Sequence, residues 1–396
     1  MMQISPETQL FIREHSSDDV RVLALQAKKY PDIDMPTAIT QIAGRKVAAE
    51  KIPSWWEIEK IWYPKHLSLE QCSSEITARY KARLLQGDSL TDLTGGFGID
   101  CSFLATGFKS ATYVERQEEL CEIAAHNFPV LNLNHINIKN EDGVTYLQVM
   151  SPVDCLFLDP ARRNEHGGKT VAISDCEPNV AELEELLLQK ANRVMIKLSP
   201  MLDLSLALKE LKQTQEVHIL SVNNECKELL ILLGQTSPAE ISIHCVNLFT
   251  KGTQKEQHFV FTREQEQCSE CTYTDSLETY LYDPNASLLK AGAFRSIAAA
   301  YPVRKLHPNS HLYTSDTFIE NFPGRIFRIV NQCSFNKKEV KENLADLKKA
   351  KVTVRNFPAT VAELRKRIHL AEGGDTYLFA STLNNGQKVL IRCEKV

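Results

Sequence analysis

LTDLTGGFGID, residues 90–100, places three glycines within four positions, between a short apolar run and a helix-like segment. Glycines at such a turn let the backbone bend sharply and approach a ligand closely. A dinucleotide-binding turn would have the spacing G-x-G-x-x-G, and a phosphate-binding loop would continue with Gly-Lys-Ser/Thr. The stretch has neither feature, which leaves a different ligand, or a tight strand-to-helix turn that binds nothing.

Apolar runs typical of buried strands alternate with helix-like segments along this part of the chain. We expect strands at residues 90–94, 111–115, 136–140, 153–159, 193–199, 216–222 and 228–234. Helices are expected between them at 100–108, 117–128, 143–150, 180–190 and 204–213. This alternation is typical of a parallel sheet covered on both faces. Only NNECK separates the last two runs, so they should pair antiparallel. The sequence therefore predicts an α/β fold with a seven-stranded, mostly parallel Rossmann-like sheet and an antiparallel closing hairpin.

The flanking regions have other patterns. Residues 1–87 show the apolar spacing of several short helices. After residue 236 we expect paired strands, a turn leading into a helix over 277–303 and a polar connecting segment over 307–324. The last part has the order βαβαββ of a ferredoxin-like α+β layer. We predict four domains: a helical module (1–87), the sheet domain (88–236), a small α+β ferredoxin-like region with a connector (237–324) and a final α+β domain (325–396).

Composition excludes several classes of protein. No apolar run approaches the roughly 18 residues of a membrane span, and the N-terminus lacks the pattern of a secretory signal. The eleven cysteines are scattered and odd in number, which favours free thiols in a reducing compartment over a disulfide framework. We therefore expect a cytoplasmic protein with no membrane partner.

Charge is distributed unevenly along the chain. The net charge is −4, but residues 288–396 contain 19 Lys and Arg against 9 Asp and Glu. The remaining residues contain 27 basic against 41 acidic side chains. A basic C-terminal part on an acidic body indicates either a polyanionic partner or a solvated basic surface.

Acidic residues end or follow four successive predicted strands, at Asp92, Glu115, Asp142 and Asp159. The carboxyl ends of parallel strands form the edge at which an open α/β sheet binds its ligand. Asp159 ends the apolar run VDCLFL, where a carboxylate has no packing role, so a site role is favoured there.

Together these positions suit a nucleoside with a zwitterionic tail. Gly96 and Gly98 would let the backbone approach the amino-acid tail, and Asp92 would hold its ammonium group. Glu115 can accept hydrogen bonds from two ribose hydroxyls, and Asp142 can accept one from an adenine amine. The alternatives are structural, since Glu115 and Asp142 could each cap the helix that follows.

With these motifs, residues 88–236 resemble a class I S-adenosylmethionine-dependent methyltransferase. The N-terminal helices, EQCSSEITARYKARLL before the turn, DPARR, and the tail VTVRNFP…ELRKRIHL resemble the bacterial group with a C-terminal THUMP-like domain. The resemblance implies S-adenosylmethionine as the cofactor and RNA, commonly tRNA, as the partner of the THUMP-like domain. It implies the cofactor-binding residues Asp92, Thr94, Gly95, Gly96, Gly98, Glu115, Asp142 and Gly143. We expect no metal site.

The resemblance also places Asp159 and Pro160 at the methyl acceptor. In amino-group methyltransferases this motif reads (D/N/S)-P-P-(Y/F/W), where the first two residues accept the target amine and the aromatic ring stacks on the base. Here Ala161 and Arg162 occupy the last two positions. We expect Arg162, or Arg163, to stack its guanidinium plane on a base or to hold a phosphate.

Two cysteine motifs are interpreted as structural. Cys268 and Cys271 form one C-x-x-C pair without a second pair at zinc-site spacing, which favours two loop thiols. Cys101 lies at the donor turn, whereas a catalytic nucleophile must face the acceptor.

The first hypothesis is an enzyme that methylates a base nitrogen of tRNA or rRNA. One alternative is an RNA-binding protein with an inactive methyltransferase fold. Another is a methyltransferase that acts on a small molecule or a protein.

Overall fold

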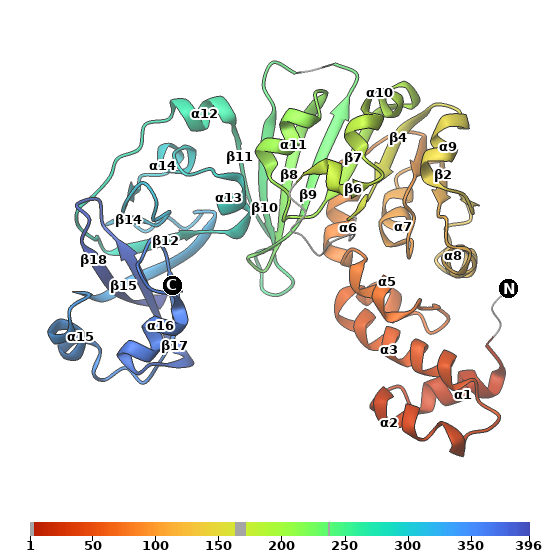
Figure 1. The fold of residues 1–396 in the computed structure, drawn as a ribbon, viewed down its shortest axis with the longest axis horizontal. Helices are drawn as coiled ribbons and strands as arrows, with labels where there is room; N and C mark the ends of the chain where they lie inside the picture. The colour runs from red at the N-terminus through yellow and green to blue at the C-terminus, as the bar shows by residue number, and fades with distance from the viewer. Residues whose placement is uncertain (1–3, 163–171, 237) are drawn as a thin grey trace. The chain divides into compact units, whose positions relative to one another are not determined.

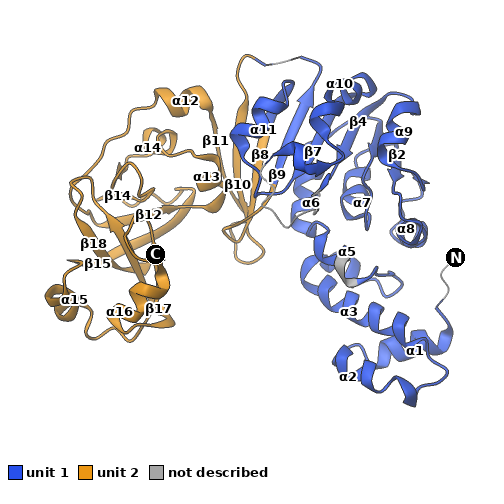
Figure 2. Cartoon of the chain, in the orientation of Figure 1, with its two compact units in different colours: residues 1–216, 229–238 blue, residues 217–228, 239–396 orange. Residues whose placement is uncertain are grey.

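The computed structural model describes residues 4–162, 172–236 and 238–396 (Figure 1). The chain forms two compact units (Figure 2). The first unit comprises residues 1–216 and 229–238, and the second comprises residues 217–228 and 239–396. Among the described helices, none has both the length and the apolar character that crossing a bilayer requires.

The N-terminal part of the first unit is helical, as predicted. Its early helices begin at polar caps: the side chains of Ser5, Asp19 and Asp34 each accept a backbone N–H of the first turn. The elements are α1 (Pro6–Glu14), α2 (Val20–Leu25), η1 (Ala27–Lys29), α3 (Met35–Lys51), α4 (Pro53–Trp56), α5 (His66–Gln71) and α6 (Glu75–Ala82).

A mixed sheet follows, in the order β11-β10-β8-β9-β7-β4-β1-β2-β3. Its strands are β1 (Ser89–Asp92), β2 (Ser110–Val114), β3 (Ile136–Lys139), β4 (Val153–Leu158), β7 (Ala191–Leu198), β8 (Thr214–Val222), β9 (Glu225–Gly234), β10 (Ser242–Leu248) and β11 (Glu256–Thr262). The helices are α7 (Ile99–Ala105), α8 (Glu118–Val130), α9 (Gly143–Val149), α10 (Val180–Lys190) and α11 (Leu204–Glu210). Between β4 and α10 lie β5 (Ala161–Arg162), η2 (Ile173–Asp175) and β6 (Cys176–Glu177).

The seven predicted strands and the antiparallel closing hairpin are confirmed. Strands β3, β2, β1, β4 and β7 are parallel, and β9 runs antiparallel to β7. The sheet does not end there, because β10 and β11 form an antiparallel pair that continues it beyond β8. The sequence pattern placed this pair after the sheet, since a hairpin's pattern does not show which sheet edge it joins. The four predicted domain boundaries stay predictions.

The second unit contains a seven-stranded sheet in the order β13-β14-β12-β15-β18-β17-β16. Its strands are β12 (Tyr280–Pro284), β13 (Arg304–Lys305), β14 (Tyr313–Ser315), β15 (Gly324–Ser334), β16 (Lys349–Val354), β17 (Ala371–Thr382) and β18 (Lys388–Lys395). Its helices are α12 (Arg263–Cys268), α13 (Ala286–Ala291), α14 (Ser296–Ala300), α15 (Lys337–Leu344) and α16 (Val361–Ile368). The βαβαββ order of the last part is therefore confirmed. Two details differ, because 277–303 contains strand β12 and 307–324 contains strand β14.

The helical module and the glycine turn share one hydrophobic core within the first unit. Trp55 of α4 is 2% exposed, and its ring packs edge-on against Phe97, with centroids 5.2 Å apart. Phe97 lies inside the turn, between Gly96 and Gly98. The same cluster includes Ile99 of α7, so the helices support the turn through direct packing.

We expect Trp55→Ala to lower the free energy of unfolding of the first unit by about 3–5 kcal/mol, because it leaves a cavity beside the turn. Urea unfolding followed by circular dichroism would measure this loss. Trp56→Ala is the matched control, since Trp56 is 42% exposed on the same helix. Equal effects of the two substitutions would show that the shared core does not support the turn.

Candidate active site

The glycine turn connects β1 to α7 and needs glycine for different reasons at each position. Gly96 and Gly98 have φ values of +54° and +87°, in the left-handed region that favours glycine. A Cβ on Gly96 would have only the Thr94 carbonyl oxygen nearby, at 3.8 Å, so this position faces open space. A Cβ on Gly95 would lie 2.2 Å from the ring of Tyr113. Gly95 therefore packs on a tyrosine, and Gly96 presents the open backbone.

Glu115 lies immediately after β2 and holds the turn. One carboxylate oxygen accepts the Gly96 N–H at 2.9 Å, and the other accepts the Gln117 N–H at 2.8 Å. Tyr113 adds a second tie, because its hydroxyl donates to the Gly96 carbonyl at 2.5 Å. The carboxylate keeps lone pairs beyond these two bonds, so it retains capacity to accept a ligand hydroxyl.

Asp92 ends β1 and has an unusual environment. Its Oδ1 accepts the Thr94 N–H at 2.9 Å, whereas its Oδ2 is buried without a hydrogen-bond partner among the described residues. Burial raises the pKa of Asp92 to about 8, and the bond from Thr94 acts in the opposite direction. An unpaired buried carboxylate oxygen beside an open glycine backbone suits a ligand that carries a positive charge.

Asp142 caps α9, as the structural alternative proposed. Its Oδ1 accepts the backbone N–H groups of Val144 and Thr145 at 3.1 and 2.9 Å. Packing explains why residue 143 is a glycine, because a Cβ there would lie 2.1 Å from the Leu93 carbonyl oxygen. Asp142 and Gly143 both lie at the carboxyl edge of the sheet. The donor-binding role of Asp142 stays a prediction, because its capping bonds neither require nor exclude a ligand.

Asp159 follows β4 and is tied to the glycine turn. Its backbone N–H donates to the Thr94 hydroxyl at 2.6 Å, so Thr94 links the end of β1 to the end of β4. The Asp159 side chain is 37% exposed, whereas Pro160 is buried. Arg162 is in β5, whose partner strand is β6, and Arg163 lies outside the described residues.

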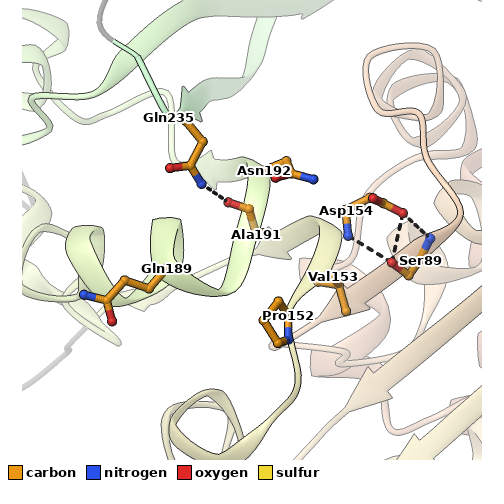
Figure 3. Close-up of a pocket in the computed structure, with 8 residues that line it drawn as sticks. All are labelled: Ser89, Pro152, Val153, Asp154, Gln189, Ala191, Asn192 and Gln235. Atoms are coloured by element: carbon orange, nitrogen blue, oxygen red, sulfur yellow. Dashed lines mark hydrogen bonds between the residues drawn. The ribbon is translucent and has the colours of Figure 1, made fainter.

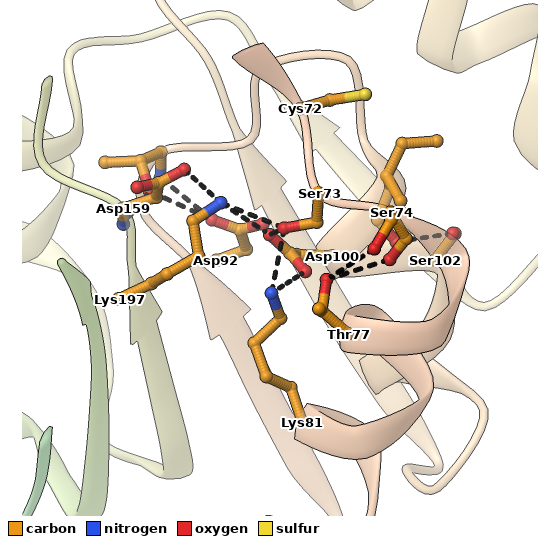
Figure 4. Close-up of polar contacts among 12 residues, drawn as sticks. Cys72, Ser73, Ser74, Thr77, Lys81, Asp92, Asp100, Ser102, Asp159 and Lys197 are labelled. Atoms are coloured by element: carbon orange, nitrogen blue, oxygen red, sulfur yellow. Dashed lines mark hydrogen bonds and ion pairs between the residues drawn. The ribbon is translucent and has the colours of Figure 1, made fainter. Parts of the chain in front are cut away.

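A set of charged side chains that sequence reasoning missed lies beneath Asp159 (Figure 4). The Lys197 ammonium, at the end of β7, pairs with Asp159 at 2.5 Å and with Asp100 at 3.1 Å. It also donates to the Ser73 hydroxyl at 3.0 Å. Lys81 of α6 pairs with Asp100 at 2.9 Å and is fully buried. A lysine inside the apolar strand sequence RVMIKLS is the signal that could have identified Lys197.

The carboxylates of this set have shifted pKa values. Burial alone would raise the pKa of Asp100, but the ammonium groups of Lys197 and Lys81 hold it well below its usual range. Desolvation raises the pKa of Asp159, even with part of its side chain exposed, and Lys197 opposes that rise. Asp100 is thus a permanent anion, while Asp159 is the carboxyl group closer to a change of protonation state.

A cavity of about 270 Å³ lies elsewhere (Figure 3). It is lined by Ser89, Val153 and Ala191, which begin β1, β4 and β7, together with Pro152, Asp154, Gln189, Asn192 and Gln235. The amino ends of parallel strands form the edge opposite the one that binds ligands. This cavity is therefore not part of the candidate site.

The cysteines and histidines do not alter this assignment. Cys268 and Cys271 are free thiols, as are the other nine cysteines. His218 and His244 come together on neighbouring strands of the sheet, with rings stacked at 4.3 Å. His244 also hydrogen-bonds to His258 at 3.1 Å.

Family models match the second unit. A ferredoxin-like domain model matches residues 280–323, and a THUMP domain-like model matches residues 324–395. No curated protein matches the chain significantly.

Solved structures match the whole chain or its sheet. A crystal structure of a proposed methyltransferase from Porphyromonas gingivalis W83 is 34% identical, covers 100% of both chains and has a TM-score of 0.87. An rRNA methylase from Streptococcus thermophilus is 14% identical over 40% of this chain and 93% of its own, with a TM-score of 0.30. A proposed methyltransferase from Streptococcus mutans in complex with SAH is 14% identical over 40% of this chain and 96% of its own, with a TM-score of 0.30.

The raised pKa of Asp92 predicts a pH-dependent cost to stability. The folded protein keeps this proton up to about pH 8, while the unfolded chain loses it near pH 4, so Asp92 destabilises the fold increasingly as pH rises through this window. We expect Asp92→Asn to raise the melting temperature more at pH 8 than at pH 5. Asp203→Asn, at the exposed cap of α11, is the control and should show no such difference. A pH-independent effect of Asp92→Asn would contradict the assignment.

Proposed function

The chain belongs to the class I S-adenosylmethionine-dependent methyltransferases, in the bacterial group with a C-terminal THUMP-like domain, and we propose that it methylates a base nitrogen of structured RNA, a tRNA or an rRNA. We place the catalytic domain at residues 88–236, after a helical module over 1–87. The RNA-binding part would then comprise the regions 237–324 and 325–396. The eleven free thiols of the chain suit a cytoplasmic enzyme.

One observation carries the proposal. The open glycine backbone at Gly96 and the half-exposed carboxylate of Asp159 lie at the ends of neighbouring strands β1 and β4 and are joined through Thr94. A donor held at the first and an acceptor held at the second would be brought together in a fixed orientation. Orientation of this kind can supply a large part of the rate enhancement of a direct transfer between two bound groups.

The donor half of the site suits S-adenosylmethionine, which would supply an electrophilic methyl group. Asp92 would face the ammonium of its amino-acid part, where the unpaired Oδ2 gains a charge partner. Gly96 would leave space for this part, whereas Gly98 packs against the Phe128 ring and, with Gly95 and Thr94, shapes the turn. Glu115 would accept from the ribose hydroxyls while holding Gly96, and Asp142 with Gly143 would flank the adenine.

At the acceptor half, Asp159 and the Pro160 carbonyl would orient the target nitrogen. The target nitrogen would lose a proton when it gains the methyl group, and Asp159 would accept this proton directly or through water. Arg162 would contact the base or its phosphate in place of a stacking ring. A base in a duplex would first be flipped out of its stack.

RNA is favoured as the substrate by charge and by domain type. Residues 288–396, which include the THUMP-like region, contain 19 basic against 9 acidic side chains. Phosphate contacts made by such a surface release counterions, so RNA affinity should fall steeply with salt.

The donor half is tested by calorimetric titration of the full chain with S-adenosylhomocysteine. We expect binding by the wild type and at least a tenfold weaker affinity for Glu115→Ala, because the substitution removes both a ribose acceptor and a support of the turn. Glu118→Ala is the control, since Glu118 is exposed three residues further on. No binding by the wild type, or equal binding by both variants, would refute the donor site.

The acceptor half is tested by mass spectrometry of modified nucleosides from cells with and without the protein. We expect one methylated base to be lost from tRNA or rRNA and restored by the wild type but not by Asp159→Ala. An unchanged nucleoside profile combined with donor binding would favour the inactive RNA-binding alternative. Salt-sensitive RNA binding would count against a small-molecule or protein substrate, whereas a lack of RNA binding would favour one.

A further inference from the structure

We propose that Lys197 is a positioning residue that holds Asp159 ionised and correctly oriented, and that the buried Asp100–Lys81 pair holds Lys197. This inference rests on the proposed function, because it assigns Asp159 to the acceptor side. It concerns the contacts behind the reacting group, and none of these three residues was predicted from sequence to bind the donor or the acceptor.

Exposure increases along this series of side chains from the core towards the site. Lys81 is 0% exposed, Asp100 is 9%, Lys197 is 10% and Asp159 is 37%. Opposite charges alternate along it, so each charge has a neighbour that compensates its desolvation. Asp159 is therefore the end of the series that an incoming group can reach, and the other three act through it.

The geometry at Lys197 explains how it would fix Asp159. An ammonium group has three N–H donors, and Lys197 has three oxygen acceptors within 3.1 Å: Asp159 Oδ2, Asp100 Oδ2 and the Ser73 hydroxyl. These acceptors come from the residue after β4, from α7 and from the segment before α6. An ammonium held from three directions has one position, and it presents its positive charge to one oxygen of Asp159.

Electrostatics gives Lys197 a second role. Asp92, Asp100 and Asp159 place three carboxylates in one region: Asp100 and Asp159 raise the pKa of Asp92, and Asp100 raises the pKa of Asp159. Lys81 compensates Asp100 from below, but Lys197 is the cation that contacts Asp159 directly. Without Lys197, the pKa of Asp159 would rise further, and Asp159 would be less able to accept a proton from the substrate.

The first test measures the protonation of Asp159 without any substrate. Infrared spectra of the full chain with isotopically labelled aspartate are recorded over a range of pH. For each variant, the spectrum of the same protein carrying Asp159→Asn is subtracted, so that the difference reports the protonation of the Asp159 carboxyl group. We expect Lys197→Met to move its titration upward by about 1–3 pH units, the usual influence of an adjacent opposite charge. Lys197→Arg should restore most of the wild-type titration. Lys209→Met, an exposed lysine of α11, is the control.

Ser73→Ala provides a second route if Lys197→Met does not fold. It removes one acceptor of the ammonium and leaves every charge in place. We expect a smaller upward shift of the Asp159 titration. An unchanged titration in whichever of these two variants folds would overturn the inference.

The second test uses methyl transfer from radiolabelled S-adenosylmethionine to total RNA from cells that lack the protein. We expect Lys197→Met to lower kcat at least tenfold, to leave S-adenosylhomocysteine affinity unchanged and to move the acidic limb of the pH–rate profile upward. An equal loss of donor affinity would instead indicate a general structural role. If the wild type transfers no methyl group, the proposed function fails, while the infrared titration still decides whether Lys197 controls Asp159.

Discussion

The ion pair between Lys197 and Asp159 is the interaction on which the arrangement of the candidate site depends. Placing an ammonium group at the end of a buried strand is costly unless it is fully paired and hydrogen-bonded. Asp100 from α7 pairs with this ammonium group, and Ser73 from the segment before α6 accepts a hydrogen bond from it, which offsets the loss of its hydration. One cation therefore ties β7 to β4 and to the helix that follows the glycine turn.

This constraint explains why the N-terminal helices belong to the same compact unit as the first strands of the sheet. Lys81 of α6 compensates Asp100 from inside the core, while Trp55 of α4 packs on Phe97 within the turn. The helical module thus supplies both a charge and an apolar surface to the donor turn. It has a structural part in the site, although none of its residues was predicted from sequence to bind the donor or the acceptor.

The sequence predicted the strands well because buried parallel strands and their intervening helices have distinct apolar periods. It also placed the glycine turn, Glu115 and Asp159 at one sheet edge, since chain order and parallel pairing determine that edge. It did not show that Gly95 and Gly143 are glycines for packing, against Tyr113 and the Leu93 carbonyl. Such contacts join residues 18 or more positions apart, and no local pattern reports them.

Lys197 illustrates the same limit for the site. The argument that a carboxylate at the end of an apolar strand has no packing role identified Asp159, and it applied equally to the lysine in RVMIKLS. Its partners Asp100 and Ser73 lie 97 and 124 residues away in the chain, so only folding could reveal them. The sequence by itself determined the order of strands and the edge at which ligand-binding groups meet. Only the tertiary structure decided which charges compensate one another there, because pairing depends on distances of a few ångströms between side chains that are remote in sequence.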